Sequence, residues 1–476
     1  MSYVLRNALI PTSTGYETTD VHIEGERIAA IGSGLKDSVP LTGTATSTEL
    51  DARDKLLLPG FVNAHTHSSE MWQRGIIPPY PLELWIAQLH EYSPLDTEKV
   101  YLSALGTAVE TLLTGGTAVV DHLVLIPGQE LATIEAAVQA YRQSGIRAFI
   151  GPLIQDQALS TGVPTGESTD LEHEAYPLTT AEVLGIVEEA VRQFHRPEEG
   201  ISLMVAPTGI QLCSDDLFKG CVELSQTYNL PRHAHLLETR AQQMLAQEKY
   251  GCSAVEHLDR LGYLDDKTSL AHCVWLTDAD IEILACTGST VVHNPLSNLR
   301  LGSGIAPILK YRQAGVNVSF GCDGSASNDS QDLLEAIKIG SILHNVTDFD
   351  YRHWITPRES VEMAARGGAT GLGMADQFGS LAVGMQADLV LYDLTQLSLL
   401  PRTDPIGLLI LGRPTQVVDS VWVKGKQVVS AGTVTTVDVD QLRQDLFAHS
   451  NWDPFRQSKQ AEQLEDRYRR VMGLPE

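Results

Sequence analysis

The sequence predicts an α/β protein, in which a (β/α)8 TIM barrel carries a small β-sandwich domain built from both termini. Three observations lead to this prediction. Strand and helix patterns alternate through the middle of the chain, short strands and turns fill both ends, and ionisable residues stand where the middle strands end. The 476 residues, 43% of them hydrophobic, suffice for a large core and more than one domain.

The β domain is predicted from the likeness of the two ends. Residues 20–32 form two strand-like runs about Gly25, which is a hairpin pattern. Residues 387–393 and 417–429 have the same character, and Gly425 stands at a turn. Because the middle of the chain differs from both ends, we expect the ends to assemble into one β domain with the barrel inserted between them.

These patterns also set the expected domain boundaries. The tail of the chain is charged and helical over 440–447 and 460–472, and we expect it to pack on the barrel or on another subunit. The expected units are a composite β domain of residues 1–58 and 376–437, a metal-dependent barrel of residues 59–375, and a C-terminal helical tail of residues 438–476.

The barrel is predicted from eight strand-like segments over about 310 residues, a length suited to a (β/α)8 unit. Helical patterns such as 97–113, 131–144 and 180–194 lie between most of them. A doubly wound open sheet is the main alternative, but no G-x-G-x-x-G follows the first strand, which weakens a dinucleotide-binding interpretation. The expected strands are 56–64, 117–122, 146–154, 201–207, 231–236, 268–274, 289–293 and 316–322.

Ionisable or imidazole side chains end five of these strands. His65 and His67 end the first, and residues two apart on a strand point to the same side. One buried polar residue is commonly a satisfied core or capping group, because burying it unpaired costs free energy. Five such strand ends would converge on one barrel mouth, where barrel enzymes carry their chemistry. The other four segments are 232–238, 270–273, 292–298 and 320–324.

Composition argues against several classes of partner. Lys plus Arg total 34 against 60 Asp plus Glu, and the formal charge of -26 disfavours nucleic acid and anionic membrane. Six cysteines without a C-x-x-C pair predict a reduced, cytoplasmic protein with buried thiols. The N-terminus lacks a signal-peptide pattern, and no apolar run approaches the roughly 20 residues that span a bilayer.

As an ordered set, the motifs resemble the amidohydrolase superfamily. Within it the chain is similar to the branch that contains S-adenosylhomocysteine deaminase, guanine deaminase and the triazine hydrolases (chlorohydrolases). Residues 379–390, GSLAVGMQADLV, resemble the family's return into the small β domain, and the resemblance covers residues 20–430. The motifs that carry it are PGFVNAHTH (59–67), HLLE (235–238), HC (272–273), HNPLSN (293–298) and DG (323–324).

The resemblance implies a metal ion held by His65, His67, His235 and Asp323. Three nitrogens and one oxygen suit Zn2+, with Fe2+ as the alternative. Some relatives hold two metals bridged by a carboxylated lysine on the fourth strand. Residues 201–208, ISLMVAPT, contain no lysine, so we expect one metal ion per subunit.

The resemblance also implies catalytic roles. Zinc lowers the pKa of a bound water to about 7, so that hydroxide is available to attack an electron-poor ring carbon. Asp323 accepts the proton of that water, and Glu238 protonates a ring nitrogen and then assists the leaving group. His272 donates a hydrogen bond or orients the attacking water. Loss of ammonia or an amine leaves a carbonyl.

Residues around these motifs have less defined roles. His293 contacts the substrate or braces the site, His233 belongs to a barrel layer beside the metal ligands, and His122 could line the pocket. Loop-shaping or packing roles are expected for Asn294, Asn298, Cys273 and Cys322. The residues expected to bind substrate are Trp72, Gln73, Trp85, Gln155 and His293, with Glu70 and Tyr80 on the same loop as Trp72, although each loop residue could instead serve only to anchor the loop.

The fourth strand argues against a nucleoside substrate. Adenosylhomocysteine deaminases usually carry a histidine after the Ala-Pro of this strand, whereas Thr208 follows Pro207 here. A free aminopurine, pterin, pyrimidine or triazine therefore fits at least as well as a nucleoside.

Three functions are compatible with the sequence. The first is a metal-dependent aminohydrolase, or deaminase, acting on an amino-substituted N-heterocycle. The second is hydrolysis of a cyclic amide, a urea-like group, a ring halide or an alkylamine by the same groups, and ammonia release would distinguish the two. A non-catalytic member should have lost a ligand or Glu238, and all are present. The P-C-x-x-C signature of the base-editing zinc deaminases is absent. The resemblance makes a homodimer or larger homo-oligomer the expected assembly.

Overall fold

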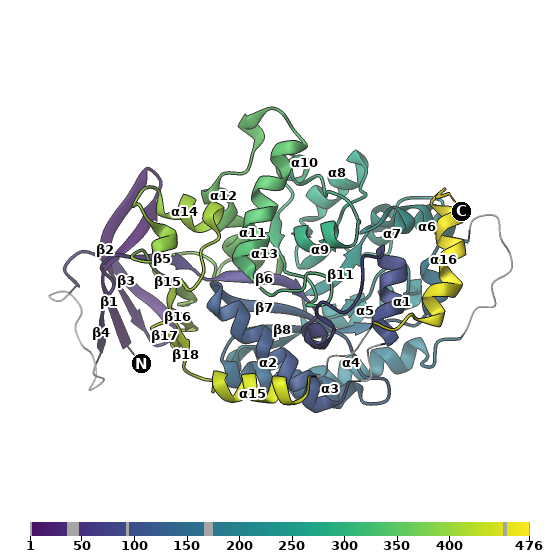
Figure 1. The fold of residues 1–476 in the computed structure, drawn as a ribbon, viewed down its shortest axis with the longest axis horizontal. Coiled ribbons are helices and arrows are strands. Elements are labelled where there is room, and N and C mark those ends of the chain that lie inside the picture. The colour runs from purple at the N-terminus through teal and green to yellow at the C-terminus, as the bar shows by residue number, and fades with distance from the viewer. Residues whose placement is uncertain (1, 36–46, 92–94, 166–174, 451–454, 476) are drawn as a thin grey trace.

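The computed structural model of the chain describes residues 2–35, 47–91, 95–165, 175–450 and 455–475. Two bodies lie side by side along the long axis of the molecule (Figure 1). One is a sheet that contains strands from both ends of the chain, and the other is a helix-covered parallel sheet made by the middle of the chain.

The middle of the chain forms the parallel strands, and nearly all of their residues are buried, as expected for strands covered on both faces. β6, β7 and β8 pair in that order, with β9 and β10 on the far side of β8, and β11 to β14 form a second run. The strands are β6 (Phe61–Thr66), β7 (Gly116–Leu123), β8 (Arg147–Ile154), β9 (Ile201–Leu203), β10 (Ala206–Pro207), β11 (Arg232–Leu236), β12 (Thr268–His272), β13 (Thr290–His293) and β14 (Val318–Phe320).

Backbone bonds join the two runs and curl the sheet into a TIM-barrel-like ring. At one seam, Val205 and Arg232 form a parallel bridge. At the other, the Asp323 N–H donates to the His65 carbonyl over 2.9 Å. The expected alternation of strands and helices is confirmed, and the sheet is curled rather than open and doubly wound.

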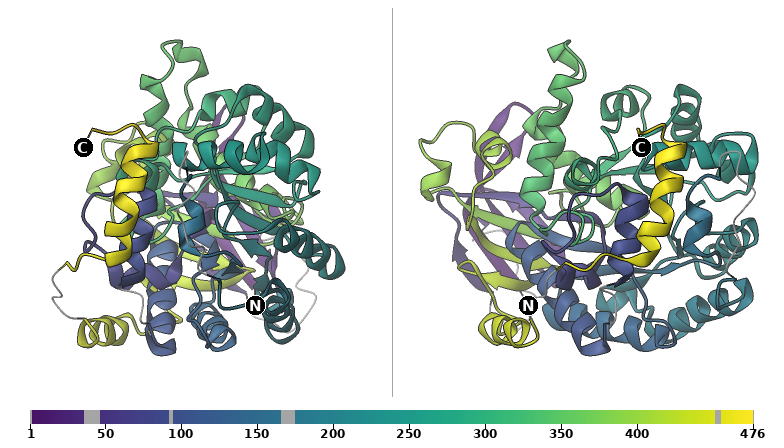
Figure 2. Two further views of the ribbon diagram at one scale, coloured as in Figure 1. Left: turned by 90° about the vertical axis from the view of Figure 1, so that its right-hand side faces the viewer. Right: turned by 45° about the vertical axis from the view of Figure 1, so that its right-hand side comes forward.

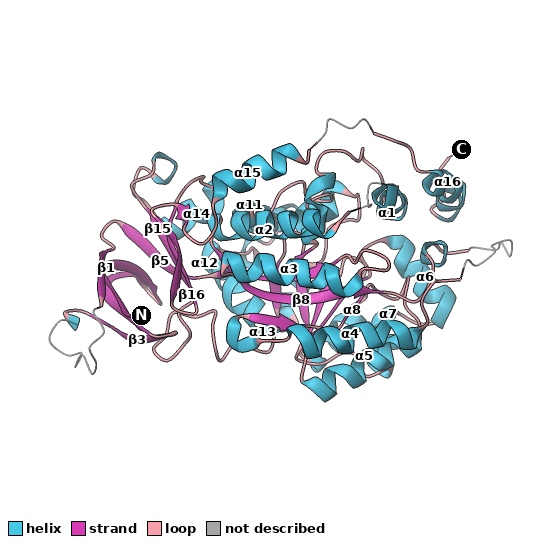
Figure 3. Ribbon diagram, turned by 90° about the horizontal axis from the view of Figure 1, so that it is seen from below, coloured by secondary structure: helices cyan, strands magenta, loops and turns pink. Residues whose placement is uncertain are grey.

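Helices cover the outside of this ring, as the view from below shows for α2 to α5 (Figure 3). The three helices named from the sequence are confirmed nearly to the residue, because side-chain caps such as Asp96 on α2 and the Thr179–Glu182 capping box on α4 define their starts. The helices over the ring are α2 (Thr97–Leu113), α3 (Glu130–Ser144), α4 (Thr180–Phe194), α5 (Asp215–Tyr228), α6 (Arg240–Tyr250), α7 (Ala254–Arg260), α8 (Asp278–Thr287), α9 (Pro295–Arg300), α10 (Ile308–Gln313), α11 (Leu333–Ile342), α12 (Pro357–Glu362) and α13 (Gly368–Gly371).

The second sheet has nine strands and mixes both termini, so that β5 lies between β1 and β15. The hairpin about Gly25 is confirmed as the β2–β3 turn. A two-layered sandwich and the exact domain boundaries stay predictions. The strands are β1 (Ser2–Thr12), β2 (Gly15–Glu24), β3 (Arg27–Gly32), β4 (Thr48–Asp51), β5 (Lys55–Pro59), β15 (Leu389–Asp393), β16 (Val418–Val423), β17 (Lys426–Ser430) and β18 (Thr433–Val434).

The expected first barrel strand, 56–64, is wrong as a single strand. It is divided at Gly60 into β5, which pairs with β15 in the nine-stranded sheet, and β6, which pairs with β7 in the ring. Pro59 has no N–H to continue a ladder, and the Gly60 N–H donates to the Asp388 carbonyl instead. A Cβ at Gly60 would lie 2.2 Å from Thr117 Cγ2, so only glycine permits this close crossing.

The tail packs on the ring, as expected for one of its two alternatives. α15 (Val439–Ala448) lies beside α2, and α16 (Lys459–Val471) lies along α1 (Leu82–Glu91), as both views of Figure 2 show for the yellow C-terminal helix. The remaining helices are α14 (Pro405–Gly412) and the short turns η2 (Ser68–Gln73), η3 (Leu159–Gly162), η4 (Pro197–Glu199), η5 (Leu343–Val346), η6 (Tyr351–His353), η7 (Met363–Gly367) and η8 (Leu397–Leu399). Among the described residues, no helix is both long and apolar enough to cross a membrane.

Candidate active site

Four side chains from the carboxyl ends of three strands meet at the mouth of the ring. His65 and His67 come from the end of β6, His235 from β11, and Asp323 from the segment after β14. The Nε2 atoms of His65 and His67 lie 3.2 and 3.5 Å from Asp323 Oδ1. The Nε2 atoms of His67 and His235 are 3.2 Å apart. The structure thus brings together all four side chains that the sequence predicted as metal ligands.

Hydrogen bonds on the far side of two rings fix their tautomers. His67 Nδ1 lies 2.6 Å from the His122 carbonyl, and His235 Nδ1 lies 2.7 Å from the Thr208 carbonyl. A carbonyl only accepts, so each Nδ1 carries a proton, and Nε2 of each neutral ring then presents a lone pair. Two facing lone pairs repel unless a cation lies between them, and buried His65 Nε2 has no hydrogen-bond partner among the described residues either. This donor set of three imidazoles and a carboxylate fits Zn2+.

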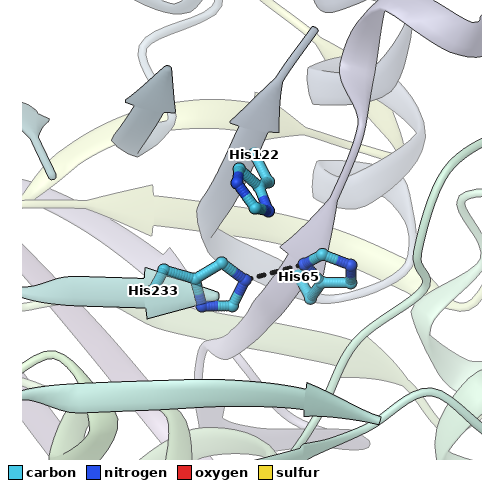
Figure 4. Close-up of side chains that lie close together, drawn as sticks. All are labelled: His65, His122 and His233. Carbon is cyan, nitrogen blue, oxygen red and sulfur yellow. Dashed lines mark hydrogen bonds between the residues drawn. The ribbon is translucent and has the colours of Figure 1, made fainter. Parts of the chain in front are cut away.

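A layer of histidines supports the ligands from below. His65 Nδ1 lies 2.8 Å from His233 Nε2 (Figure 4). His233 Nδ1 in turn lies 2.7 Å from Ser269 Oγ. When the His65 Nε2 lone pair faces the ligand cluster, His65 Nδ1 donates to His233 Nε2, and His233 Nδ1 donates to Ser269 Oγ. His122 stacks on His235 with ring centroids 4.7 Å apart and donates from Nε2 to the Ala206 carbonyl. His233 therefore occupies the barrel layer that the sequence predicted.

Asp323 is held in a rare backbone conformation. Its φ of +65° lies in the left-handed region, which non-glycine residues seldom adopt. The conformation is maintained because its N–H donates to His65 and its carbonyl accepts from Thr66 Oγ1 and Gln331 Nε2. Burial opposes ionisation of Asp323, but the imidazoles of His65 and His272 hold its pKa well below the usual range. Asp323 is therefore an anion beside the cluster.

Glu238 and His272 face each other beside this anion. Glu238 Oε2 lies 3.5 Å from His272 Nε2, and Ser303 donates to Glu238 Oε1 over 3.2 Å. Burial and the negative charge of Asp323 raise the pKa of Glu238 well above its usual range, which favours a carboxyl group that carries a proton. Burial lowers the pKa of His272. A neutral carboxylic acid opposite an imidazole is suited to proton transfer.

Asn298 has a role that the sequence interpretation missed. Its Oδ1 accepts from His272 Nδ1 over 2.9 Å, so this side chain orients a predicted catalytic group in addition to shaping a loop. His272 itself has a φ of +73°, which turns its ring toward the mouth. The signal was present in the sequence, because Asn298 ends the HNPLSN motif, but only the fold reveals which strand end it reaches.

A cavity of about 100 Å³ opens on these side chains, which is several times the roughly 10–15 Å³ that one water needs. His67, His235 and Asp323 line one end, and Glu238 and His272 line it beside them. The residues of the wall include Glu70, Trp85, Leu89, Val124, Gln155 and Leu301.

Two of the five predicted substrate-binding residues, Trp85 and Gln155, line this cavity. Of the described residues, Trp72, Gln73 and His293 are not part of its lining. Trp72 packs outward, where Nε1 donates to the Lys99 carbonyl over 2.9 Å. His293 is fully buried, and its Nε2 lies 3.2 Å from His344 Nε2. The apolar walls from α1, such as Leu89, went unnoticed because a helical apolar face looks like ordinary core in a sequence.

The chain is similar to known metal-dependent hydrolases over nearly its whole length. The sequence profile of the Amidohydrolase family matches residues 56–428. A 5-methylthioadenosine/S-adenosylhomocysteine deaminase of Desulforudis audaxviator is 33% identical over 449 residues, which cover 93% of this chain and 96% of that protein.

Two solved structures share the fold over both chains. An adenosine deaminase from Xanthomonas campestris with bound zinc has a TM-score of 0.81 and 27% identity, covering 98% of this chain and 99% of that one. An atrazine chlorohydrolase from Arthrobacter aurescens TC1 complexed with zinc has a TM-score of 0.84 and 26% identity, covering 94% and 99%.

Proposed function

Because the chain belongs to the amidohydrolase family, we propose that it is a zinc-dependent aminohydrolase that removes an amino group from a nitrogen heterocycle. The observation that carries the proposal is the pair of Nε2 lone pairs on His67 and His235, 3.2 Å apart and next to the Asp323 carboxylate. This arrangement suits a cation, and beside it stands Glu238, whose pKa burial and the charge of Asp323 raise.

His65, His67, His235 and Asp323 hold the ion in this proposal. A zinc ion bound there supplies hydroxide at neutral pH, because it lowers the pKa of water to about 7. The carbonyls behind His67 and His235 keep both rings oriented and raise their basicity. One ion per subunit is proposed, since β9 and β10 contribute no lysine to bridge a second.

The proton steps belong to three side chains. Asp323, which is an anion, accepts the proton of the attacking water. Glu238 gives its proton to a ring nitrogen, a role that its burial favours. The carboxylate so formed then takes the remaining proton of the attacking oxygen and passes it to the departing amino group, and the proton on Asp323 restores Glu238 at the end of the cycle. His272, held by Asn298, orients the reacting oxygen.

The substrate is proposed to be a flat heterocycle gripped by the cavity wall. Trp85 offers an aromatic surface, and Gln155 and Glu70 offer polar groups to the ring edge. Relatives named as deaminases of adenosine derivatives favour an aminopurine ring. Thr208 stands where adenosylhomocysteine deaminases usually carry a histidine, and its hydroxyl donates to the Ile154 carbonyl over 3.0 Å. No imidazole is therefore available at this position to contact a sugar. The proposal includes both a free base and a nucleoside. The expected homo-oligomer and cytoplasmic location stay predictions.

A second function has support from the structural neighbours named as triazine hydrolase and atrazine chlorohydrolase. The protein named as an atrazine chlorohydrolase shares the fold at a TM-score of 0.84. Hydroxide attack and protonation by Glu238 serve a halide or alkylamine leaving group equally well. Chloride release with no ammonia release would therefore replace the first function by the second.

The test is ammonia release by zinc-loaded protein across aminopurines, aminopterins, aminopyrimidines, aminotriazines and adenosine derivatives. Glu238→Gln should keep the metal and lose about 10²–10⁴-fold in turnover, because the amide cannot transfer a proton. Glu282→Gln, an exposed glutamate on α8, is the matched control and should retain full activity. Normal turnover in Glu238→Gln with the active substrate would remove the proposed role.

A further inference from the structure

Glu83 is a buried carboxyl group that the proposed reaction does not use. It lies on α1 with 6% of its surface exposed, two residues before the cavity residue Trp85. Its Oε1 accepts a hydrogen bond from the Thr239 hydroxyl, while its Oε2 has no partner in the part of the chain that the structure describes. A buried glutamate is costly unless its oxygens are satisfied, so a partner for this second oxygen is needed.

The hydrogen-bond partner of Glu83 is Thr239, the residue that follows Glu238. Thr239 caps α6 by accepting from the Gln242 N–H, and the Gln242 side chain in turn accepts from the Glu238 N–H over 2.9 Å. The backbone on both sides of Glu238 is thereby tied into one network. Glu83 is the member of that network that comes from α1, the helix that also walls the cavity.

A small second cavity accounts for the remaining oxygen. A space of about 20 Å³ lies beside the substrate cavity, and its polar lining consists of Glu83, Gln211 and Gln242. Buried Gln211 Oε1 also lacks a partner among the described residues. One water needs roughly 10–15 Å³ and two to four polar partners. One water in this space would accept a hydrogen bond from the protonated Glu83 Oε2 and donate a hydrogen bond to Gln211 Oε1.

We propose that Glu83 is a positioning residue, which fixes the Glu238 carboxyl group through Thr239 and is itself held by a buried water shared with Gln211. This inference rests on the proposed role of Glu238 in proton transfer. In this inference, α1, which forms a wall of the cavity, moves together with the proton carrier Glu238. Substrate that presses on Trp85 is thus aligned with Glu238 through a rigid path of three hydrogen bonds.

Four single variants and one double variant test the inference on zinc-loaded protein. Glu83→Leu and Thr239→Val remove the contact from either side, and each should lower kcat by about tenfold or more, since misplacement of a reacting group by about 1 Å can cost 10²-fold. KM and bound zinc should stay close to the parent values. Glu83→Gln and Thr239→Ser keep the hydrogen bond and should restore most of kcat. The double variant Glu83→Leu/Thr239→Val should lose no more kcat than either single variant, because both substitutions remove the same contact.

Full kcat in Glu83→Leu would overturn the inference. An equal loss of kcat in Glu83→Gln, or a loss of kcat caused by release of zinc, would also overturn the inference, because a purely structural role of Glu83 predicts those results. The crystal structures of the parent and Glu83→Leu proteins give a readout that does not depend on activity. A water between Glu83 and Gln211, and a displaced Glu238 in the variant, are expected. A missing water or an unmoved Glu238 refutes the inference even if no substrate is found, whereas inactivity of the parent protein alone would refute only the proposed function.

Discussion

At the scale of single residues, the ligand rings of His67 and His235 are oriented by backbone carbonyls rather than by acidic side chains. The carbonyl of Thr208 holds His235, and the hydroxyl of the same residue turns back to the Ile154 carbonyl. The departure from the adenosylhomocysteine deaminase pattern at this position thus keeps the support of the metal ligand and changes only what the substrate would meet. At position 208, the backbone carbonyl orients His235, whereas the side chain determines what the substrate meets.

Asp323→Ala should weaken zinc retention. The substitution removes the one anionic member of the proposed ligand set and leaves three imidazoles, which bind a divalent cation less tightly. Metal content after dialysis, measured by atomic absorption, should fall well below one ion per chain. Asp329→Ala is the control, because Asp329 lies near the same loop and bonds Gly75 and Arg300 instead. Equal metal content in both variants would contradict the ligand assignment.

Glu83→Gln should change stability in a pH-dependent way. Burial raises the pKa of Glu83, so the folded protein holds this proton while the unfolded chain releases it above about pH 4.3. Stability from the protonated form is present below that pH and is lost as the pH rises toward the folded pKa. Glutamine does not titrate, so the melting temperature of the variant relative to the parent should rise from pH 4 to pH 8. A constant difference would contradict the raised pKa.

The residues of the proposed metal site could be named from the sequence because the chemistry of metal binding is strict, and the structure brings the four side chains together. Imidazoles and a carboxylate that converge from several strand ends seldom serve a purpose besides metal binding. The substrate residues could not be predicted in the same way. Trp72 and Trp85 look alike in the sequence, and only the fold shows that Trp72 donates to Lys99 on the outside while Trp85 lines the cavity.

At the scale of elements, α16 packs on the outside of α1, the helix that lines the cavity. Its Leu464 and Tyr468 pack with Leu84 and Ala87 of α1. Its Arg467 side chain is buried and donates to the carbonyls of Ser160, Pro164 and Val163, on the segment after β8. α16 therefore packs on two segments, α1 and the segment after β8, and α1 also carries the cavity residues Trp85 and Leu89.

Arg467→Ala should lower the free energy of unfolding by about 2–4 kcal/mol, because three buried carbonyls lose a charged donor. The KM should rise as well, since the wall next to Gln211 loosens. Arg470→Ala is the control, because Arg470 is exposed on the same helix. Denaturant unfolding and steady-state kinetics provide the two measurements. Equal stability of the two variants would show that α16 is only a surface helix.

Strand existence could be predicted, but strand partnership could not. Periodicity is a local signal: Pro59-Gly60 marks a break in the apolar run 56–64, but nothing in the run shows that the chain passes to another sheet there. The reason for the change lies in Thr117 and Asp388, which are remote in sequence. Helix ends were predictable for the opposite reason, since caps such as Asp96 act within one turn.

At the scale of the whole molecule, one buried ion pair joins the ring to the nine-stranded sheet. Arg147 at the start of β8 lies 2.9 Å from Asp388, with 4% and 0% of the two side chains exposed. Asp388 also accepts from the Lys424 N–H at the β16–β17 turn. The same arginine lies over the Phe378 ring at 4.5 Å. The two sheets thus share a charged and desolvated contact.

Arg147→Met should destabilise the protein by about 3–5 kcal/mol, because it leaves the Asp388 carboxylate buried and unpaired. We expect calorimetry to show a lower melting temperature and a broader transition, as the two sheets separate. Arg142→Met removes a half-exposed pair with Glu199 and should change stability by less than about 1 kcal/mol. Equal effects of the two substitutions would contradict a joining role for Arg147.

The crossing of β5 between sheets has a consequence for how the protein is made. Pro59 finds its partner Leu389 only after most of the chain has been synthesised. At about 5–20 residues per second, the ribosome needs roughly 15–65 s to travel from one to the other. During that interval β5 presents an open edge to every other nascent chain nearby, and such edges template aggregation. β5, which is joined through Gly60 to the strand that carries His65, is therefore exposed to wrong pairing until the C-terminal strands have been made.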